Sequence, residues 1–513
     1  MIDCIQRILV NAFCLVVAIL VVALACFRWR YQYWKRKNVP YLEPSIPFGS
    51  IGNILLENRD VNIAKIYEKV KSKDWKYCGL YMLLSPVFLV VDIDLVKRIL
   101  ASDFQYFNSR GTYTNEVDDP VGCNLFSLSG KKWKNLRTKL TPAFSSGKLK
   151  SMFQTVVDCG LALEEHLQEN YLGSDPLDAK NVMQCFSTDV IGSCAFGIDC
   201  NSFKDPNTKF KEVTNKFFFS SKLDAVLWLF VDNFPVLSRL LKIRMVKKEI
   251  GDFFIDLVDS TVAYREANNY MRKDFMQQLI DIRNGKYGSI DQFNGHSDEV
   301  PSLTMDEIAA QTFIFFVAGS ETSGTTLTFA LFEMAMHPEI QDRLREEILT
   351  VLSKHDGKIT YDSLNEMKYM SQVIDETLRL YSPAQALERR CLEDYKIPGE
   401  DIILEKGTRV MLSVKGIHYD EDYWPNPKQF DPDRFSDENR KNMNPFTFLA
   451  FGQGPRICVG DRFGRMQVKV GLTSVLRKFR VKLNKRTKVP LTMSEKSLIA
   501  SADGEIWLNL EKL

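Results

Sequence analysis

The chain has 513 residues, of which 45% are hydrophobic and 26% are charged, so it is long enough to bury a large core. Its 67 basic and 65 acidic side chains leave a net charge of only +2, which gives no reason to expect nucleic-acid binding. The eleven cysteines include no Cys-x-x-Cys pair, which argues against a zinc ribbon and against a secreted disulfide framework. Their scatter fits a protein of a reducing compartment.

The first element is an apolar run over residues 8–27 with one polar interruption, Asn11. Twenty helical residues at ~1.5 Å each just span a ~30 Å hydrocarbon core. A cleaved signal peptide is the alternative, but its apolar region would cover only ~7–15 residues. The aromatic and basic residues of 28–37 are typical of an interfacial anchor with its positive side in the cytosol. We therefore expect residues 1–38 to form an uncleaved membrane anchor followed by a basic interfacial segment.

A proline-rich segment, residues 39–53, comes next and predicts a stiff spacer before a catalytic domain at 54–513. Two β-rich runs, Tyr77–Leu84 and Val87–Val91, predict a hairpin that turns at Ser85-Pro86. Residues 104–126 lack periodicity, and an irregular stretch of this length in a compact domain is usually functional or disordered.

The middle of the chain has mostly helical periodicity. Residues 131–140 predict a basic helix that carries Trp133 and Arg137 on one face. On spacing alone this pair is an ordinary half-buried tryptophan beside a surface arginine. Residues 148–267 follow the same period and contain an aromatic-rich patch, which is either core packing or an access lip that dips into a membrane surface. Residues 286–300 are polar and predict a loop.

A long helix is predicted to begin at the capping box formed by Thr304 and Glu307 and to continue to His337-Pro338, over ~50 Å. Its middle reads AGSETSG, and these poor helix formers predict a kink or an opened turn. Glu321 and Thr322 form an acid–alcohol pair at this point. The alternative is a destabilised helix centre whose hydroxyl is bonded to the backbone.

Glu376 and Arg379 lie one turn apart on a helix predicted over 367–380. An isolated pair of this kind contributes only ~0.3–0.5 kcal/mol. Short strands are expected at 395–397, 402–404 and 408–414, and a hairpin tip at 497–502. His418 is a weak site candidate that is equally well explained as a turn histidine at a strand end.

The stretch FGQGPRICVG, residues 451–460, organises the rest of the chain. Its glycines let the backbone approach a flat object closely. Cys458 lies just ahead of a predicted helix that opens with Asp461, where the helix dipole favours a thiolate. A lone cysteine in such a place would be read as a buried structural residue. The full spacing favours a metal ligand instead.

The pattern F-x-x-G-x-R-x-C-x-G resembles the haem-binding loop of the cytochrome P450 family. The W-x-x-x-R, A-G-S-E-T-S, E-x-x-R and FDPDRF motifs resemble further elements of that family and occur in its order. In ETLRLYSPA, YKIPG, FDPDRF and FGQGPRICVGDRFG the chain looks like the microsomal, xenobiotic-metabolising branch found in insects. The resemblance implies a mainly α fold with small β-sheets, a long central helix over the haem and a single N-terminal membrane anchor.

The resemblance also implies a role for each motif. Cys458 would be the thiolate ligand of haem b, and Glu321 and Thr322 would serve oxygen activation. The implied haem-binding residues are Phe451, Gly454, Arg456, Gly460, Trp133, Arg137 and Arg389, with Arg390 as the alternative to Arg389. Glu376, Arg379 and Arg434 would form a structural triad. The implied substrate cavity is lined by Phe107, Tyr113, Phe126, Phe219, Phe315, Ala318, Ala384 and Leu387.

The implied reaction is RH + O2 + NADPH + H+ giving ROH, water and NADP+, on lipophilic substrates. NADPH would act indirectly through NADPH–haemoprotein reductase, with cytochrome b5 as a further candidate partner, at the cytosolic face of the endoplasmic reticulum membrane. Acidic partners suit a basic face predicted from Lys131, Lys132, Lys134, Lys139, Arg462, Arg465 and Lys469. A fatty-acid peroxide isomerase and a haem-based sensor or electron carrier are the alternatives, and the acid–alcohol pair argues against both.

Three residues depart from the family pattern around the cysteine loop, namely Ala450, Gln453 and Asp461. Many relatives have proline, glutamate and an apolar residue at these places. An acid so close to the thiolate is expected to lower the haem potential or to alter partner docking.

Overall fold

The structure is a computed structural model that describes residues 2–52, 58–171, 175–205, 208–219, 221–285 and 302–513. The predicted loop at 286–300 lies outside the described residues. The helices are α1 (Ile2–Arg30), α2 (Tyr33–Arg36), α3 (Arg59–Lys71), α4 (Ile93–Lys97), α5 (Gly130–Leu140), α6 (Ser146–Asn170), α7 (Ala179–Ile191), α8 (Lys209–Phe218), α9 (Lys222–Asn233), α10 (Pro235–Leu240), α11 (Lys248–Ala267), α12 (Phe275–Arg283), α13 (Met305–Met336), α14 (Pro338–Ser353), α15 (Tyr361–Glu366), α16 (Lys368–Leu380), α17 (Val414–His418), α18 (Asp437–Asn442) and α19 (Asp461–Leu476). The strands are β1 (Tyr77–Met82), β2 (Ser85–Val90), β3 (Leu177–Asp178), β4 (Ala386–Arg390), β5 (Tyr395–Lys396), β6 (Ile403–Leu404), β7 (Arg409–Ser413), β8 (Phe479–Leu483) and β9 (Trp507–Lys512).

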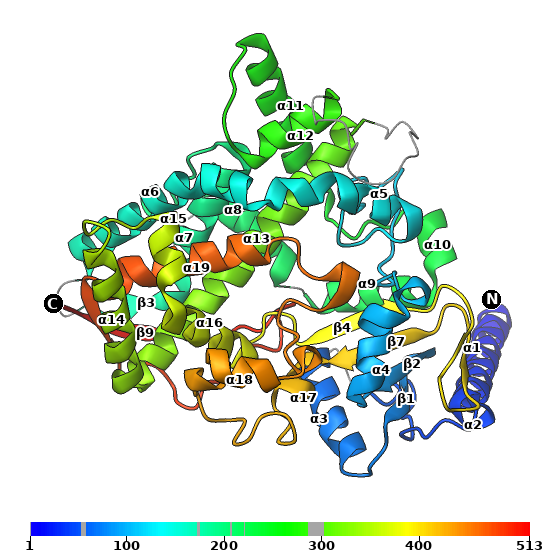
Figure 1. Ribbon diagram of the computed structural model, residues 1–513. Helices are drawn as coiled ribbons and strands as arrows, with labels where there is room; N and C mark the ends of the chain where they lie inside the picture. The colour runs from blue at the N-terminus through cyan, green and yellow to red at the C-terminus, as the bar shows by residue number, and fades with distance from the viewer. Residues whose placement is uncertain (1, 53–57, 172–174, 206–207, 220, 286–301) are drawn as a thin grey trace, which may run out of the picture.

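The predicted mainly α architecture with small sheets is confirmed (Figure 1). Strands β1, β2, β7 and β4 form the largest sheet, in that order, and lie at one side of the molecule beside α1. The helical side contains α6, α7, α14 and α19, with α13 running between α7 and α19. Two hydrophobic clusters follow this division, one around α13 and one around the sheet.

The hairpin of β1 and β2 is confirmed, but its predicted turn is wrong. The chain turns at Leu83 and Leu84, and Leu83 has a φ of +53°. Pro86 lies inside β2 opposite Tyr81, whereas the parallel pairing of β2 with β7 begins only at Val87. Proline is tolerated there because that part of β2 is still an edge, where a missing N–H breaks no ladder.

Helix α13 begins as predicted. Thr304 accepts the Glu307 backbone N–H at 3.1 Å, and the Glu307 carboxylate accepts the Thr304 backbone N–H at 2.9 Å. The α-helix continues without a break through residues 318–324, so the predicted opened turn is wrong. The hydroxyl of Thr322 donates to the carbonyl of Ala318 at 2.7 Å, a bond that satisfies the side chain without opening the turn.

The N-terminal segment combines an exposed helix with a buried end. One described helix, Cys4–Arg36, is long and apolar enough to cross a membrane, with a mean hydropathy of 3.0. Of the predicted interfacial aromatics, only Trp29 is exposed, because Tyr31, Tyr33 and Trp34 are buried against the large sheet. The prediction that these aromatics lie at a membrane interface is therefore wrong for three of the four.

The segment predicted as a stiff spacer is attached to the large sheet in its described part, residues 39–52. Tyr41 forms a bridge to Gly79 and Gly49 one to Met82, so the segment runs against β1. Gly49 has a φ of +85°, and a Cβ there would lie 2.1 Å from the carbonyl oxygen of Tyr81. The close approach to β1 thus requires glycine and fixes the segment to the sheet.

Trp34→Ala should destabilise the folded protein by about 3–5 kcal/mol, the range for removing a large buried aromatic side chain. Trp34 is 1% exposed, and its indole N–H donates to the Leu80 carbonyl at 2.8 Å. Its ring lies flat over Gly79, where a Cβ would come within 2.4 Å of it. Denaturant unfolding checks the value. Trp29→Ala is the matched control, since Trp29 is exposed, and an equal loss in both variants would contradict the observed docking.

Candidate functional site

The cysteine loop between residues 451 and 460 is a tight turn that leads into α19. Gly454 has a φ of +73°, and a Cβ there would lie 1.9 Å from the carbonyl oxygen of Leu100. The backbone N–H of Cys458 donates to the Phe451 carbonyl at 2.9 Å, which closes the loop. Helix α19 then begins at Asp461. The loop therefore presents Cys458 at the N-terminal end of a helix, as the sequence predicts.

Cys458 faces an interior space. It is exposed, whereas the three other exposed cysteines all lie in α1. Burial nevertheless raises the pKa of its thiol, against a hydrogen bond from the Gly460 backbone and the positive charges of Arg110 and Arg137, which lower it. Accessible surface combined with strong desolvation is what a side chain has when protein surrounds the open space in front of it.

Four arginines gather near Cys458 without an acidic partner. They are Arg110, Arg137, Arg389 and Arg456, which we call the arginine cluster. Within the described residues, no carboxylate lies at ion-pair distance from any of the four. The buried Nε of Arg389 has no hydrogen-bond partner. Buried charges are normally paired, so the uncompensated positive charge of the cluster fits an anionic group from outside the chain.

The pKa values of these arginines also show that no negative charge compensates their positive charge. Burial, followed by repulsion from Arg110, lowers the pKa of Arg389 to about 9. Burial lowers the pKa of Arg456 to about 8, and three neighbouring arginines add to the effect. Burial also lowers the pKa of Arg110 to about 10. Like charges held together in this way favour the binding of a dianion.

One stripe of α13 remains open although the helix is otherwise packed nearly all round. Ala318 is exposed, and Phe315 and Thr322 are partly exposed, at spacings that put all three on one face. Gly464 of α19 lies close to α13, since a Cβ there would come 3.8 Å from the Ser323 hydroxyl. The open stripe and the start of the helix that follows Cys458 thus belong to the same region of the interior.

Glu321 and Thr322 point in different directions. Glu321 is 3% exposed and lies against α7, where it interacts with Gln184 and Lys180. Burial raises the pKa of its carboxyl to about 7, and those two neighbours oppose the shift. The structure therefore places the hydroxyl on the open stripe and the acid behind it.

The predicted Glu376, Arg379 and Arg434 side chains are brought together. Glu376 and Arg379 are fully buried and share two contacts of 2.7 Å. Arg434 Nε lies 3.4 Å from Glu376 Oε1. Arg379 also donates to the carbonyls of His418 and Pro427, both at 2.8 Å, and thereby holds the end of α17 and the loop that follows it against α16.

Residues 42–508 match the family described as Cytochrome P450. The chain belongs to the cytochrome P450 family. It is 40% identical to cytochrome P450 6a2 of Drosophila melanogaster over 489 residues, covering 94% of this chain and 96% of that relative. It is also 40% identical over 496 residues to cytochrome P450 6A1 of Musca domestica, covering 96% of each. The resemblance to insect microsomal members is thereby confirmed.

This membership confirms several expectations together. A cytochrome P450 is a haem-thiolate monooxygenase whose electrons come from NADPH through a reductase, and it acts on lipophilic xenobiotic or endogenous compounds. Haem carries two carboxylates, and the arginine cluster offers uncompensated positive charge beside a cysteine at a helix N-terminus. The residues present therefore fit the cofactor that the family requires.

Arg456 of the cysteine loop is held by more contacts than the sequence predicts. Its guanidinium donates to the carbonyls of Asn108 at 2.9 Å and Phe126 at 3.3 Å. It also lies over the ring of Trp133, 4.2 Å from the centroid. Arg456 thus ties α5 and the irregular segment 104–126 to the cysteine loop.

Sequence reasoning missed Arg110, which lies in that irregular segment. Arg110 donates to the carbonyls of Arg456 at 3.3 Å and Phe126 at 3.1 Å. The one available signal was an arginine within a long aperiodic stretch, which is often functional. The structure also separates Arg389 from Arg390. Arg389 faces Arg110, whereas Arg390 lies in the field of Arg409 and Asp232.

The predicted cavity residues divide into two sets. Ala384 is exposed, and Leu387 lies beside the cysteine loop, 3.9 Å from the position of a Cβ on Gly452. Phe219 forms a bridge to Ser497, so the predicted tip at 497–502 meets the end of α8. Phe107 is wrongly predicted, because its side chain is fully buried and packs edge-on against Tyr395 in the sheet cluster.

Tyr113 and Phe126 are less well placed to line the predicted substrate cavity. Tyr113 is buried, and half of Phe126 is exposed beneath the Arg110 guanidinium, which lies 4.3 Å from its ring centroid. His418 is a structural residue. It is buried between the Arg379 carbonyl at 2.9 Å and the Leu449 backbone N–H at 2.8 Å, and burial lowers its pKa to about 3.

The predicted basic face is smaller than expected. Lys469 is turned inward and donates to the carbonyls of Leu364 and Met367, and Arg465 pairs with Asp375. Lys131, Lys132, Lys134 and Arg462 remain exposed, and Lys132 pairs with Glu116 at 2.6 Å.

Glu321→Gln should remove a pH dependence of stability. The folded-state pKa of Glu321 is raised from 4.5 to about 7, so its stabilising contribution is complete below the lower value and is lost as pH rises through the higher one. The neutral amide avoids this loss, and the variant should be more stable than the wild type by on the order of 3 kcal/mol above pH 7. Denaturant unfolding on both sides of this window tests it. An unchanged pH dependence in the variant would contradict the assignment.

Proposed function

We propose that Cys458 is the thiolate ligand of haem b in this monooxygenase and that the arginine cluster holds the two carboxylates of the cofactor. One observation carries this proposal, namely four arginines without acidic partners around an exposed cysteine in an enclosed space. Phe451, Gly454 and Gly460 determine the course of the loop, and the ring of Trp133 packs against the Arg456 guanidinium. When bound, haem with a thiolate ligand supplies dioxygen binding and O–O bond cleavage.

We further propose that Thr322 and Glu321 move protons. Thr322 Oγ1 lies on the open stripe and can exchange its bond to the Ala318 carbonyl for one to a water or a substrate atom. Glu321, with a pKa of about 7, is able both to give and to take a proton near neutral pH. Glu321 lies behind the stripe and interacts with Lys180 and Gln184 of α7. We propose that it exchanges protons on this side of α13.

Glu376, Arg379 and Arg434 serve as structural support in this proposal. They hold the loops before the cysteine loop against α16, and His418 extends the same support to Leu449. Their burial away from the open stripe argues against a role in chemistry.

The substrates proposed are lipophilic molecules, such as xenobiotics, insecticides, terpenoids, fatty acids or steroids. The accessible side chains Phe315, Ala318, Ala384 and Leu387 would line the pocket, and Phe219 with 497–502 would form its lip. These side chains are apolar or small, so they select for shape and hydrophobicity rather than for charge.

The proposed electron donor is NADPH–haemoprotein reductase, with cytochrome b5 as a second partner. The exposed Lys131, Lys134 and Arg462 offer positive charge to an acidic docking face. We place the protein in the endoplasmic reticulum membrane, with residues 1–38 as anchor, 39–53 as connection and 54–513 as a catalytic domain facing the cytosol. The long apolar N-terminal helix supports this placement.

Thr322→Ala should separate electron use from product formation. The protein is reconstituted with the reductase, and NADPH consumption, product and hydrogen peroxide are measured on one lipophilic substrate. Loss of the hydroxyl should lower product per NADPH by on the order of 100-fold, the lower end of the usual range for a positioned proton donor, and should raise peroxide. Thr322→Ser, which keeps the hydroxyl, is the matched control. Wild-type coupling in Thr322→Ala would refute the proposed role.

A further inference from the structure

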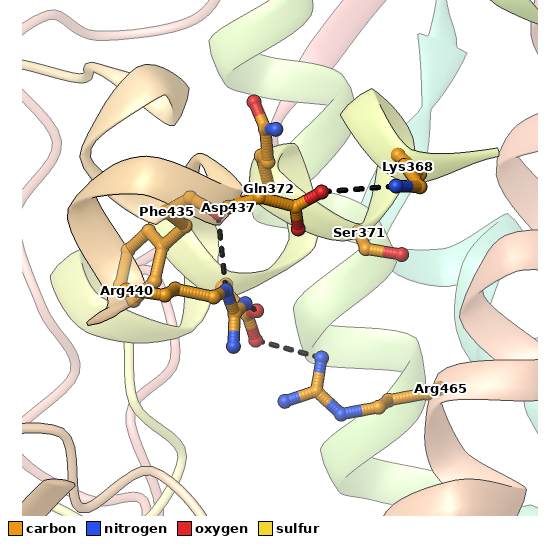
Figure 2. A pocket seen from close by; sticks show the side chains of 8 residues that line it. Lys368, Ser371, Gln372, Phe435, Asp437, Arg440 and Arg465 are labelled. Atoms are coloured by element: carbon orange, nitrogen blue, oxygen red, sulfur yellow. Dashed lines mark hydrogen bonds and ion pairs between the residues drawn. The ribbon is translucent and has the colours of Figure 1, made fainter.

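Asp375 is a buried carboxylate that the roles proposed so far leave unexplained. It precedes Glu376 on α16 and is fully buried, yet it takes no part in the Glu376 pair. Its two partners are Arg465 of α19, whose Nη1 lies 2.7 Å from Oδ1, and Arg440 of α18. Asp375 and both arginines line a surface pocket of about 440 Å³, and Figure 2 shows Arg440 and Arg465 in it.

Arg465 also contacts the cysteine loop. Its guanidinium lies over the ring of Phe451, 4.9 Å from the centroid. The Phe451 carbonyl accepts the backbone N–H of Cys458 at 2.9 Å. Arg465 therefore stands one side chain away from the proposed thiolate, and Arg440 makes no such contact, since its guanidinium lies over Phe435 instead.

Asp461 brings a negative charge to the same place. It lies three residues after Cys458 and one turn before Arg465 on α19, and it interacts electrostatically with both. Helix α19 thus carries an anion, Asp461, at its start and a cation, Arg465, one turn later. Asp375 holds the cation by an ion pair. In a site shielded from water, charges next to a redox centre change its reduction potential strongly.

We propose that Arg465 is a positioning residue that offsets the charge of Asp461 and raises the reduction potential of the bound haem, and that Asp375 holds it over Phe451. This rests on the proposed ligand role of Cys458. A cation near the thiolate favours the reduced state, which carries one positive charge less, and an anion favours the oxidised state. The unusual acid at position 461 is then balanced by the guanidinium one turn later.

The test is a spectroelectrochemical titration of the full-length, haem-loaded protein. Arg465→Gln should lower the equilibrium constant for one-electron reduction about three- to tenfold, which corresponds to about 30–60 mV. Asp375→Asn removes an anion, which alone would raise the constant, and also releases Arg465 from its place over Phe451. A fall by a smaller factor than in Arg465→Gln is expected, because the release of Arg465 outweighs the loss of the more distant anion. Asp461→Asn should raise the constant, because it removes the anion at the start of α19. Arg440→Gln is the matched control, since it also removes a partner of Asp375 but leaves Phe451 untouched, and it should stay within twofold of the wild type.

Equal potentials in the wild type and Arg465→Gln, or the same shift in Arg440→Gln, would overturn the inference. If Arg465→Gln does not fold, Asp461→Asn decides, and an unchanged or lowered potential in it has the same consequence. A wild-type protein without a thiolate-ligated haem spectrum would instead refute the ligand role of Cys458. The two failures are therefore distinguishable.

Discussion

Cys458→Ala should abolish product formation and the binding of thiolate-ligated haem. The loss in turnover should be at least ~100-fold, beyond the ~10–100-fold typical of losing a partner that only orients a ligand. The reason is structural. Cys458 is the exposed cysteine outside α1, and its backbone is fixed by Phe451 at the start of α19. Haem content per protein and product formation with the reductase are the measurements.

Cys391→Ala is the matched control for this prediction. Cys391 is a buried thiol, 1% exposed, in the sheet cluster, and burial raises its pKa to about 12, so it stays a neutral thiol. Removing it should leave haem binding and turnover close to the wild-type values. If Cys391→Ala loses haem as completely as Cys458→Ala does, the loss follows from destabilisation and the ligand role of Cys458 is not supported.

Arg379→Ala should cost about 3–5 kcal/mol of stability, the range for breaking a buried ion pair by removing one partner. Glu376 would remain in a fully buried position, where it keeps the Asp431 backbone N–H at 3.0 Å and, as its one cation, Arg434 at the longer distance of 3.4 Å. The carbonyls of His418, Pro427 and Gln429 would also lose their donor. Denaturant unfolding gives the free energy, and haem retention during the titration reports whether the cysteine loop is released first.

Arg343→Ala provides the comparison on the surface. Arg343 pairs with Asp433 through two contacts of 2.8 and 3.0 Å, but both side chains are about half exposed, at 54% each. Exposed pairs contribute ~0–1 kcal/mol, so this variant should be nearly as stable as the wild type. Similar losses in Arg343→Ala and Arg379→Ala would show that burial does not set the value of the Glu376 pair.

Local patterns allowed much of the site to be predicted from the sequence. The cysteine loop, the capping box at Thr304 and the Glu376–Arg379 turn depend on neighbours within ten residues, and the backbone there follows from glycine, capping and helical spacing. The structure gives these segments the predicted local geometry.

Features that depend on distant segments could not be predicted in this way. The arginine cluster is formed by residues 110, 137, 389 and 456, which no periodicity connects. Strand β4, Ala386–Arg390, has a charged sequence and becomes a strand because it pairs with β7. Trp34 lies in an aromatic and basic segment that is typical of a membrane interface. It packs on β1 instead, because Gly79 has no side chain to fill the space that the ring occupies. Tertiary packing overrides local preference in each case.

The difference spectrum of the reduced protein with carbon monoxide reports directly whether a thiolate binds the haem iron. We expect a Soret band at ~450 nm for the wild type, the signature of thiolate ligation. Cys458→Ala should lack this band and Cys391→Ala should retain it. A wild-type protein that binds haem without the band, or a Cys458→Ala variant that keeps it, would show that Cys458 is not the ligand.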